Sequence, residues 1–551
     1  MTSRVRVWAP RASRIDVIRG SDPTPAAAER GGWWAGPVLA PGEDYAIAID
    51  GGPPRPDPRS RWQPHGVHGA SRWVDAGGLS PAPLACHIPL RDAVIYELHV
   101  GTFSRAGTFA GAIEHLDHLV ELGITHVELL PVAQFPGTHG WGYDGVDLWA
   151  AHAGYGGPAG LHELIGACHA RGLAVLIDVV HNHFGPEGAY VDELGPYHTP
   201  EHMTPWGPAI NLDRDGSAEV RALLIESALA WLRDYGADGL RLDALHALRD
   251  DGELHFVAEL TDAVRELERE LQRPLILIGE WDEHDPKAVR SRGAGGWGLD
   301  AHWNDDFHHA VHALVTGEHG GFYQDFAAPD TLAKVLTRGY ALDGGHSPFR
   351  GKPHGTPFGD LPRDRLVAYI QSHDQVGNRA RGDRLGQLAG PERAKVAAAL
   401  LLTSPFVPML FQGEEWAAST PFLYFTDLGS EALRTAVREG RKREHGLTGW
   451  DDACPDPTEP GAREASVLRW EERDRGDHAE MLAWYRSLIA LRREHAALRD
   501  AAPDSISVRT RGAALEVTRG PFHILASLDE RPLPIEGDVV LASPACVIVR
   551  R

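Results

Sequence analysis

The sequence predicts an α/β chain with a central (β/α)₈ TIM barrel, an N-terminal β-sandwich and a small C-terminal β-domain. The chain has 551 residues, which is long for one ordinary domain and fits a barrel with one or two small additions. Hydrophobic residues make up 43% of it, enough to bury a large core. From about residue 93, short apolar runs alternate with amphipathic segments, which is the pattern of repeated βα units.

The first 88 residues have a strand pattern. Val5 and Val7 alternate with Arg4 and Arg6, and Pro, Gly and Asp then punctuate several short runs. We therefore expect residues 1–88 to form a β-sandwich similar to a carbohydrate-binding module. Within this part the Pro-rich stretch GGPPRPDPRSRWQP is expected to be a loop.

Residues 89–499 are expected to form the barrel. Helices are predicted at 109–122, at 159–171 and in MLAWYRSLIALRREH, because their apolar residues recur with a period near 3.6. LAVLIDVV is almost continuously apolar, as expected of a parallel strand buried on both faces. The eight predicted strands lie in AVIYELHV, HVELLPV, LAVLIDVV, GLRLDA, LILIGE, DAHWND, LVAYIQSHD and VPMLFQGEE.

Two segments interrupt the alternation of strands and helices, and a third segment follows the predicted barrel. Residues 181–215 are a short insertion rich in Gly, Pro and His. Residues 339–362 are too long for a simple connection, and loops of this kind are commonly functional lids. Residues 500–551 are expected to form the C-terminal β-domain.

Charge and cysteine content exclude several classes of function. The net charge of −23 disfavours nucleic acid and anionic membranes as partners and suits a neutral ligand such as a sugar, although plain solubility is the better explanation of the acidity. The four cysteines form no CxxC pair, so we predict neither a disulfide framework nor a zinc site. The N-terminus has no apolar signal region and no apolar run approaches 18 residues, which predicts a cytoplasmic protein.

Acidic residues recur where the predicted strands end. Asp178, Asp243, Glu280 and Asp374 follow the third, fourth, fifth and seventh apolar runs. Active sites of barrels lie at the carboxyl ends of the strands, so these four side chains are expected to meet there. Buried ion pairing is the alternative explanation, and four acids on separate strands make it the weaker one.

The residues around two of these acids suggest different protonation states. Arg241 and Asp243 are two apart on a strand and point the same way, so the guanidinium should lower the pKa of Asp243 and keep it ionised. Glu280 follows an apolar strand and Gly279, so a drier setting should raise its pKa and let it donate a proton. Hydrolysis of a glycosidic bond uses two carboxyl groups that differ in this way.

Four segments resemble the signature regions of glycoside hydrolase family 13, the α-amylase superfamily. They are DVVHNH, GLRLDALH, LIGE and SHD, in this order. The resemblance implies that Asp243 is the nucleophile, that Glu280 is the acid/base and that Asp374 is a third carboxylate that holds sugar hydroxyls. It further implies sugar contacts by Tyr143, His183, Arg241 and His373, and more structural roles for Asp178 and Asn182.

Longer phrases resemble one branch of that superfamily, the maltooligosyltrehalose trehalohydrolases. YELHVGTF, HNHFGPEG, SHDQVGNRA and FQGEEWAASTPFLYFTD carry this resemblance, which covers nearly the whole chain. It implies hydrolysis of the α-1,4 bond next to a terminal trehalose unit, with maltooligosyltrehalose and related α-glucans as partners. His246 and Ala247 stand where many amylases have a Lys-His pair, so His246 and Trp281 are further candidates for substrate contact. We expect no cofactor and no metal.

Two other functions compete with this one. A glycogen-branching or debranching enzyme of the same superfamily shares the N-terminal β-domain, although QVGNRA after Asp374 favours a trehalohydrolase. A non-catalytic glucan-binding barrel is a different class, and it would be expected to have lost at least one of Arg241, Asp243, Glu280 and Asp374.

Several histidines and tryptophans allow two interpretations. His308 and His312 are four residues apart and fit a solvated or cleft-lining helix face better than a metal pair. His181 and His183 fit hydrogen bonding better than a metal pair, because no third ligand is spelled out. The aromatic residues could stack on sugars or pack in the core, with core packing least expected at Trp281; they are Trp141, Trp206 and Trp281.

Overall fold

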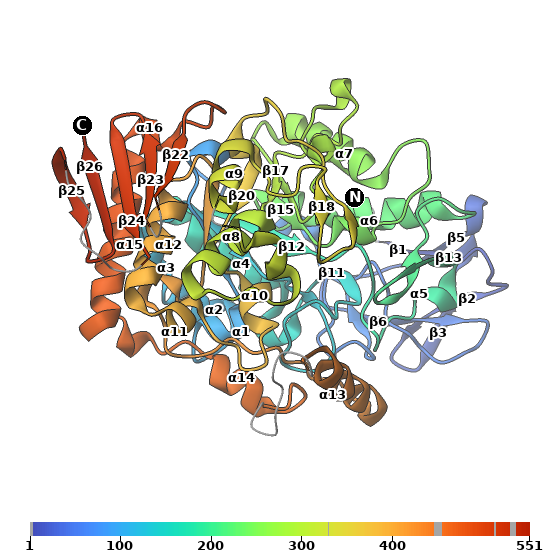
Figure 1. Ribbon diagram of the computed structural model, residues 1–551. Coiled ribbons are helices and arrows are strands. Elements are labelled where there is room, and N and C mark those ends of the chain that lie inside the picture. Colours follow the sequence, from blue (N-terminus) through green and yellow to red (C-terminus); the bar gives the residue numbers. More distant parts are fainter. Residues whose placement is uncertain (1–3, 329, 446–454, 512–513, 529–535) are drawn as a thin grey trace.

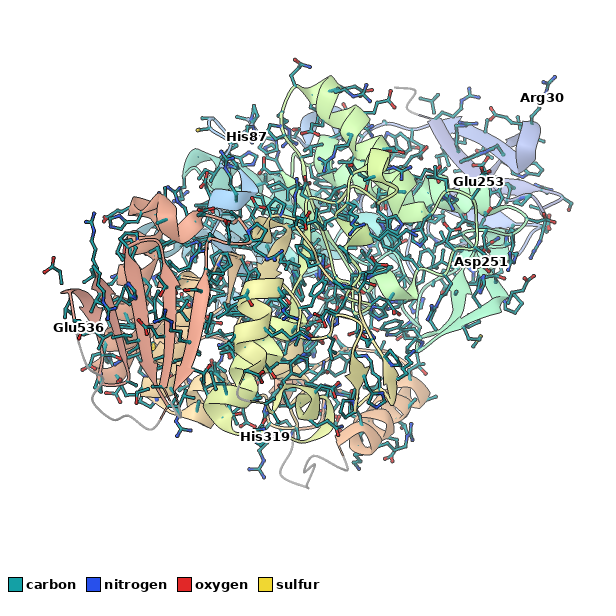
Figure 2. The ribbon with its side chains drawn as sticks, turned by 45° about the horizontal axis from the view of Figure 1, so that its top comes forward. Arg30, His87, Asp251, Glu253, His319 and Glu536 are labelled. Atoms are coloured by element: carbon teal, nitrogen blue, oxygen red, sulfur yellow. The ribbon has the colours of Figure 1, made fainter. Side chains whose placement is uncertain are left out.

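The computed structural model describes residues 4–328, 330–445, 455–511, 514–528 and 536–551, and its centre is a closed barrel (Figure 1). N-terminal sheets pack at one end of the molecule and a C-terminal sheet at the other. Arg30, in the N-terminal part, and Glu536, in the C-terminal part, accordingly lie far apart (Figure 2).

Eight parallel strands close the barrel, which confirms the predicted fold class. All their residues except Ile276 are buried, as expected when helices cover the outer face and side chains fill the inside. In their order around the barrel the strands are β8 (Ile95–Leu98), β9 (His126–Leu129), β12 (Ala174–Val179), β15 (Gly239–Leu242), β16 (Ile276–Gly279), β17 (Ala301–Trp303), β20 (Leu366–Ala368) and β21 (Val407–Phe411).

The register of neighbouring strands brings their carboxyl ends to one level. Asp178 of β12 pairs with Arg241 of β15, and Leu242 of β15 pairs with Gly279 of β16. Asp243 and Glu280 therefore leave the barrel side by side, each one residue beyond a paired position.

The helices agree with the predictions except at one place. The predicted helix at 109–122 is two helices, α2 (Phe109–Ile113) and α3 (Leu116–Leu122), because His115 leaves helical geometry and stacks on Trp470 with ring centroids 3.9 Å apart. Val120, expected on the apolar face, is 42% exposed. Other main helices are α4 (Gly157–Ala170), α6 (Ser217–Arg233), α7 (Phe256–Leu271), α8 (Asp305–Thr316), α9 (Thr331–Arg338), α12 (Pro391–Leu402), α13 (Glu431–His445) and α15 (Gly476–Glu494).

Two antiparallel sheets form the N-terminal part. Their buried residues include Val5, Val7 and Ile47, which join one core with the barrel helices. The Pro-rich stretch is a loop, and Arg61 in it donates to Asp234 at the end of α6 at 2.6 Å. The sheets are β1 (Arg4–Trp8), β5 (Trp33–Val38) and β4 (Ala27–Ala28), and β3 (Asp22–Pro25), β2 (Ile15–Arg19), β6 (Asp44–Ile49) and β7 (Ser71–Arg72).

A five-stranded antiparallel sheet forms the C-terminal part. Cys546 is buried in it, Cys168 is buried in α4 as expected, and Cys86 is exposed; all three are free thiols, and Cys454 lies outside the described residues. Its strands, in spatial order, are β22 (Ser507–Arg511), β23 (Ala514–Arg519), β24 (Phe522–Ser527), β26 (Cys546–Arg550) and β25 (Asp538–Ala542).

Both interruptions of the barrel carry small hairpins. Residues 181–215 contain β13 (His198–Thr204) and β14 (Gly207–Ile210). Residues 339–362 contain β18 (His346–Ser347) and β19 (Lys352–Pro353), so this segment is more ordered than a plain loop. Within the described ranges, no helix is both long and apolar enough to cross a bilayer.

Candidate active site

Arg241 is the centre of a charged cluster at the carboxyl end of the barrel. Its Nη1 donates to Asp178 at 2.8 Å and to Asp243 at 2.7 Å, and its Nη2 donates to Glu280 at 2.9 Å. The side chain is 1% exposed, and the indole of Trp303 lies 4.2 Å below the guanidinium carbon. Because the guanidinium is planar, it fixes three carboxyl groups from β12, β15 and β16 in one arrangement.

Backbone and amide groups complete the environment of Asp243 and Glu280. Asn182 Nδ2 donates to Asp243 Oδ2 at 3.0 Å, and the Ala244 N–H donates to Glu280 Oε2 at 2.9 Å. Ala244 has a φ of 40°, in the left-handed region that residues with a β-carbon rarely adopt. Strain of this kind often marks a functional site, and here it accompanies the N–H that faces Glu280.

A hydrogen-bonded chain reaches the same cluster from β8. Both oxygens of the buried Glu97 carboxylate contact His373, with Nδ1 at 2.6 Å and the backbone N–H at 3.0 Å. His373 Nε2 lies 2.8 Å from the Tyr143 hydroxyl, which donates to Asp178 at 2.6 Å. Since that hydroxyl has one hydrogen, Nε2 must donate to it, and His373 is therefore a doubly protonated imidazolium. Although burial opposes it, the Glu97 charge raises the pKa of His373, in agreement with this assignment.

The protonation order of the two central carboxyls is the reverse of the prediction. Burial raises the pKa of Asp243 to about 8, and Arg241 only partly offsets this. Burial also acts on Glu280, but the Arg241 charge and the Ala244 N–H outweigh it and lower the pKa of Glu280. The sequence reasoning was wrong because it assigned Arg241 to Asp243 alone, whereas the guanidinium contacts both.

Asp374 and His183 border the cluster. The strand β20 ends at Ala368, earlier than predicted, so Asp374 lies in the first turn of the short helix α10 (His373–Gly377), where it accepts from Asn378 Nδ2 at 2.5 Å. His183 lies 2.8 Å from Asn182 Oδ1 and 3.0 Å from the Tyr143 carbonyl. Burial lowers the pKa of His183 to about 4, although the Tyr143 carbonyl opposes this shift.

His246 and Trp281 line a separate hollow beside Glu280. The cavity has a volume of about 600 Å³, and its wall also includes His202, Asp250 and Glu283. Trp281 is partly buried and meets the ring of Trp297 edge-on at 4.2 Å. The Nδ1 of His246 and the Nε1 of Trp281 are buried and have no hydrogen-bond partner among the described residues. The hollow is thus lined by an aromatic residue and by charged and histidine side chains.

Four further tryptophan and histidine candidates divide into three buried residues and one exposed residue. Trp141 is core, because it is 5% exposed and donates to the Leu423 carbonyl. Trp206 is 50% exposed and stacks on His183 at 4.9 Å, so it is not a core residue. His308 and His312 are buried, which contradicts a solvated face, and they contact the Ile370 carbonyl and Glu318 respectively.

Sequence reasoning missed several residues of the site. Glu97 and Trp303 lie inside predicted strands, and a charged residue in the apolar run AVIYELHV was the available signal for Glu97. Asp305 follows β17, accepts from the Tyr369 hydroxyl and acts electrostatically on Glu280 and Asp374. Burial raises the pKa of Asp305 to about 8. Asp305 lies at the end of the sixth predicted strand, DAHWND, just as Asp178, Asp243, Glu280 and Asp374 lie at the ends of other strands, so the same pattern could have identified it.

Comparison with known proteins agrees with this geometry. Residues 91–204 match the family described as alpha amylase, catalytic domain. The malto-oligosyltrehalose trehalohydrolase of Arthrobacter ramosus is 48% identical over 98% of this chain and 96% of its own length. The chain belongs to the malto-oligosyltrehalose trehalohydrolase family. It is a glycoside hydrolase, as the family, the barrel and its carboxyl cluster agree.

Other similarities are consistent with membership of the trehalohydrolase family. The crystal structure of a Salmonella typhimurium protein named as an alpha amylase superimposes with a TM-score of 0.91 at 37% identity, over 99% of this chain and 97% of the other. A 1,4-alpha-glucan branching enzyme of Xanthomonas campestris is 29% identical, over 80% of this chain and 63% of its own. The similarity to this branching enzyme is thus lower and covers less of both chains than the similarity to the Arthrobacter ramosus trehalohydrolase.

Proposed function

We propose that this glycoside hydrolase cleaves the α-1,4 bond next to the terminal trehalose unit of a maltooligosyltrehalose and releases trehalose with retention of configuration. One observation carries the chemical part of the proposal: Arg241 binds Asp243 and Glu280 with adjacent nitrogens of one guanidinium. Carboxyls held so close together fit the separation of about 5–5.5 Å of retaining glycosidases, which is shorter than that of inverting ones. Family membership carries the substrate part.

The mechanism follows from this arrangement. Glu280 gives its proton to the glycosidic oxygen while a carboxylate oxygen of Asp243 forms a bond to the anomeric carbon, and the bond to the leaving trehalose breaks. Water then attacks the glycosyl–Asp243 ester, and Glu280 takes the water proton. Asp374, His183 and His373 hold hydroxyls of the sugar at the cleavage point, and Tyr143 supports its ring.

Substrate binding must change where the shared proton lies. The free site favours the proton on Asp243, since Arg241 and the Ala244 N–H both stabilise ionised Glu280. Catalysis needs the opposite arrangement. A glycosidic oxygen that accepts from Glu280 stabilises its protonated form, and the positive charge that develops on the sugar stabilises ionised Asp243. The proton is thus delivered only when a substrate is in place.

The hollow lined by Trp281 and His246 is the proposed binding place of trehalose. Its lining residue Trp281 directly follows Glu280, which protonates the leaving group, so the leaving sugars occupy this side. Trehalose has no reducing end and is bent, because its two anomeric carbons are joined to each other. An aromatic wall bordered by polar side chains such as Asp250 and Glu283 can recognise such a shape through stacking and hydrogen bonds.

The remaining parts of the chain fit the same proposal. The N-terminal sheets (residues 1–88) act as a carbohydrate-binding unit beside the barrel of residues 89–499, and residues 500–551 complete the fold. The free thiols suit a reducing compartment, so we place the enzyme in the cytoplasm.

A product analysis tests this function. The enzyme is incubated separately with maltotriosyltrehalose, maltopentaose and glycogen, and the products are identified by chromatography and by NMR of the first anomer formed. We expect free trehalose and the α-anomer of maltotriose from the first substrate, and much slower cleavage of maltopentaose. Transfer of glucan to form new branches would support the branching-enzyme alternative, and no turnover of any substrate would support a binding protein.

A further inference from the structure

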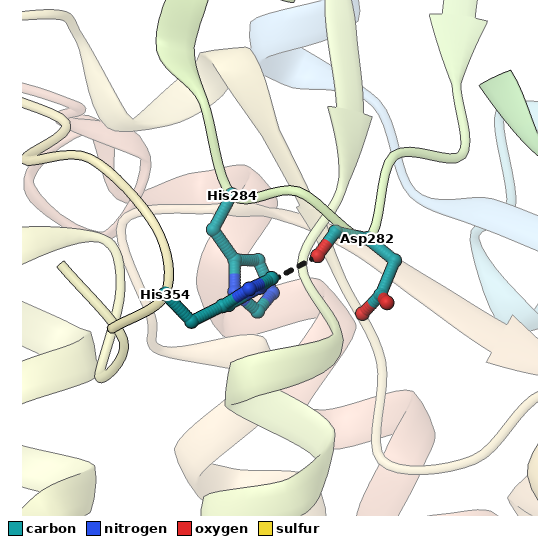
Figure 3. Close-up of side chains that lie close together, drawn as sticks. All are labelled: Asp282, His284 and His354. Carbon is teal, nitrogen blue, oxygen red and sulfur yellow. Dashed lines mark hydrogen bonds between the residues drawn. The ribbon is translucent and has the colours of Figure 1, made fainter. Parts of the chain in front are cut away.

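A cluster of two buried histidines and one aspartate with a 48% exposed side chain lies next to the hollow, outside the residues used in the proposed mechanism. Asp282 and His284 follow β16, whereas His354 comes from the 339–362 segment (Figure 3). One potential ligand atom from each residue lies within 4.8 Å of the others. His284 is 2% and His354 7% exposed.

Hydrogen bonding orients the His354 ring, whereas the His284 ring has no hydrogen bond. His354 Nε2 lies 2.8 Å from the Asp282 carbonyl, which can only accept, so this nitrogen carries the hydrogen and Nδ1 keeps a free lone pair. Neither ring nitrogen of His284 has a hydrogen-bond partner among the described residues, although Nε2 is 3.4 Å from Asp306 Oδ1. That oxygen is also buried and without a hydrogen-bond partner.

This arrangement is costly without a ligand. A buried polar atom that makes no hydrogen bond is destabilising, and three such atoms lie here: both ring nitrogens of His284 and Oδ1 of the neighbouring Asp306. Histidines that bind metals typically donate their second N–H to a carbonyl or a carboxylate. The Asp282 carbonyl has that position for His354, and the Asp306 carboxylate has it for His284.

The charges nearby also suit a cation. Asp282 and Asp306 contribute two carboxylates, and Arg350 contributes one positive charge by donating to Asp282 Oδ1 at 2.6 Å. The other oxygen of Asp282 remains for a ligand bond. A set of two imidazoles and one carboxylate matches the preferences of Zn²⁺ and other late first-row divalent ions more than those of Mg²⁺ or Ca²⁺.

We propose that Asp282, His284 and His354 form a binding site for a first-row divalent cation, with Zn²⁺ as the best fit. Small rotations of the three side chains would bring their ligand atoms to the usual distance of about 2.0–2.2 Å from the ion. A water molecule or a substrate hydroxyl would supply the fourth ligand.

The ion would join two segments that shape the leaving-group side. Asp282 lies two residues beyond Glu280, and the 339–362 segment already contacts it through Arg350 and His354. The Thr356 N–H donates to the His284 carbonyl at 2.9 Å, which adds a backbone contact between the same segments. The ion would hold this segment in place and would take no part in bond cleavage.

A second group of one histidine and two aspartates serves as a comparison for the proposed metal site. His202, Asp213 and Asp251 also lie within 4.8 Å of one another. However, the Arg214 guanidinium is 3.4 Å from His202 Nε2, and that nitrogen already lies 3.1 Å from Asp213. His202 Nε2 thus already has two partners, which makes this group a poor metal site, and it carries no proposal.

Metal titration of the full-length protein tests the proposal. The chain is dialysed against a chelator and titrated with ZnCl₂ by calorimetry, and Co²⁺ is added separately because four-coordinate Co²⁺ absorbs strongly in the visible range. We expect one ion per chain and a four-coordinate Co²⁺ spectrum. His284→Asn and His354→Gln should each weaken Zn²⁺ binding at least about 10–100-fold, the loss caused by changes to outer partners alone. His202→Gln should bind as the wild type does.

The outcomes separate the site from general effects. Circular dichroism of the metal-free variants checks that they fold, and the wild-type Co²⁺ spectrum tests the ligand set independently of any variant. The proposal is overturned if the wild type binds no Zn²⁺, if both variants bind it with unchanged affinity, or if only His202→Gln loses it. These readouts do not involve turnover, so they are independent of the proposed function.

Discussion

The charged cluster around Arg241 and the hollow lined by Trp281 and His246 are built in different ways. Around Arg241, each carboxyl group of the cluster already has charged or N–H partners within 3.0 Å. Around Trp281 and His246, buried polar atoms have no partner, and an open volume of about 600 Å³ lies beside them. The first region is organised before substrate arrives, as electrostatic catalysis requires. The second is completed by what binds there, as expected of a specificity site.

The largest expected effect comes from removing a charge at the organised centre. Asp243→Asn and Glu280→Gln should each lower kcat by at least about 10³-fold, because residues that act as a unit fail together. The measurement is single-turnover hydrolysis of maltotriosyltrehalose, with circular dichroism as the check on folding. Activity within about tenfold of the wild type in either variant would remove the distinction between the two regions.

A smaller loss of activity should follow from a change in the hydrogen-bonded series Glu97–His373–Tyr143, which reaches Asp178 from β8. Glu97→Gln removes the charge that holds His373 as an imidazolium, and hydrogen bonds to charged groups contribute about 1.5–3 kcal/mol, or roughly 10–150-fold in kcat. KM should change less than kcat. Glu415→Gln is the matched control, since it breaks a buried Glu–His contact of 2.8 Å to His118 outside the cleft. Equal losses in both variants would mean that Glu97 acts only on stability.

The open side should affect selectivity more than rate. Trp281→Ala should lower kcat/KM for maltotriosyltrehalose more than for maltopentaose, by roughly 1–3 kcal/mol, the usual range for an apolar contact in a specificity pocket. Steady-state kinetics on both substrates measures the difference. If both substrates lose equally, Trp281 does not recognise trehalose.

The pH dependence gives the smallest and most specific effect. The Asp243–Glu280 pair must keep one proton, and burial places the last ionisation near the Asp243 pKa of about 8. Above that pH the proton is lost, so kcat/KM should fall about tenfold per pH unit with a midpoint near 8. Below it, activity should be flat until the pair gains a second proton. A basic limb that begins below pH 6 would contradict this proton count.

The sequence could predict the barrel and the positions of most acids, but not their electrostatics. Eight strands were readable because each is an almost continuous apolar run, and Asp243 and Glu280 were readable because each directly follows such a run. The contact between Arg241 and Glu280 joins two strands and depends on their register, which a single chain pattern does not contain. The pKa order of Asp243 and Glu280 was therefore predicted wrongly, because the sequence does not show that Arg241 also contacts Glu280.

Tertiary contacts also explain the other differences. The break at His115 results from stacking on Trp470, a residue more than 350 positions away in the chain. His308 and His312 share a helix face, as their spacing predicts, but the packing of Tyr323 and Glu318 on that face buries them. The spacing fixes which side chains lie together, and only the fold decides what covers them.

The shared guanidinium of Arg241 has a consequence for how this protein can change by mutation. Three strand ends depend on one side chain, so the effect of altering Asp178 depends on whether Asp243 or Glu280 is intact. Energies of such neighbours do not add, and double-mutant cycles among them should show coupling of about 0.5–3 kcal/mol. Single substitutions around Trp281 should therefore have nearly independent effects, whereas substitutions around Arg241 should depend strongly on one another.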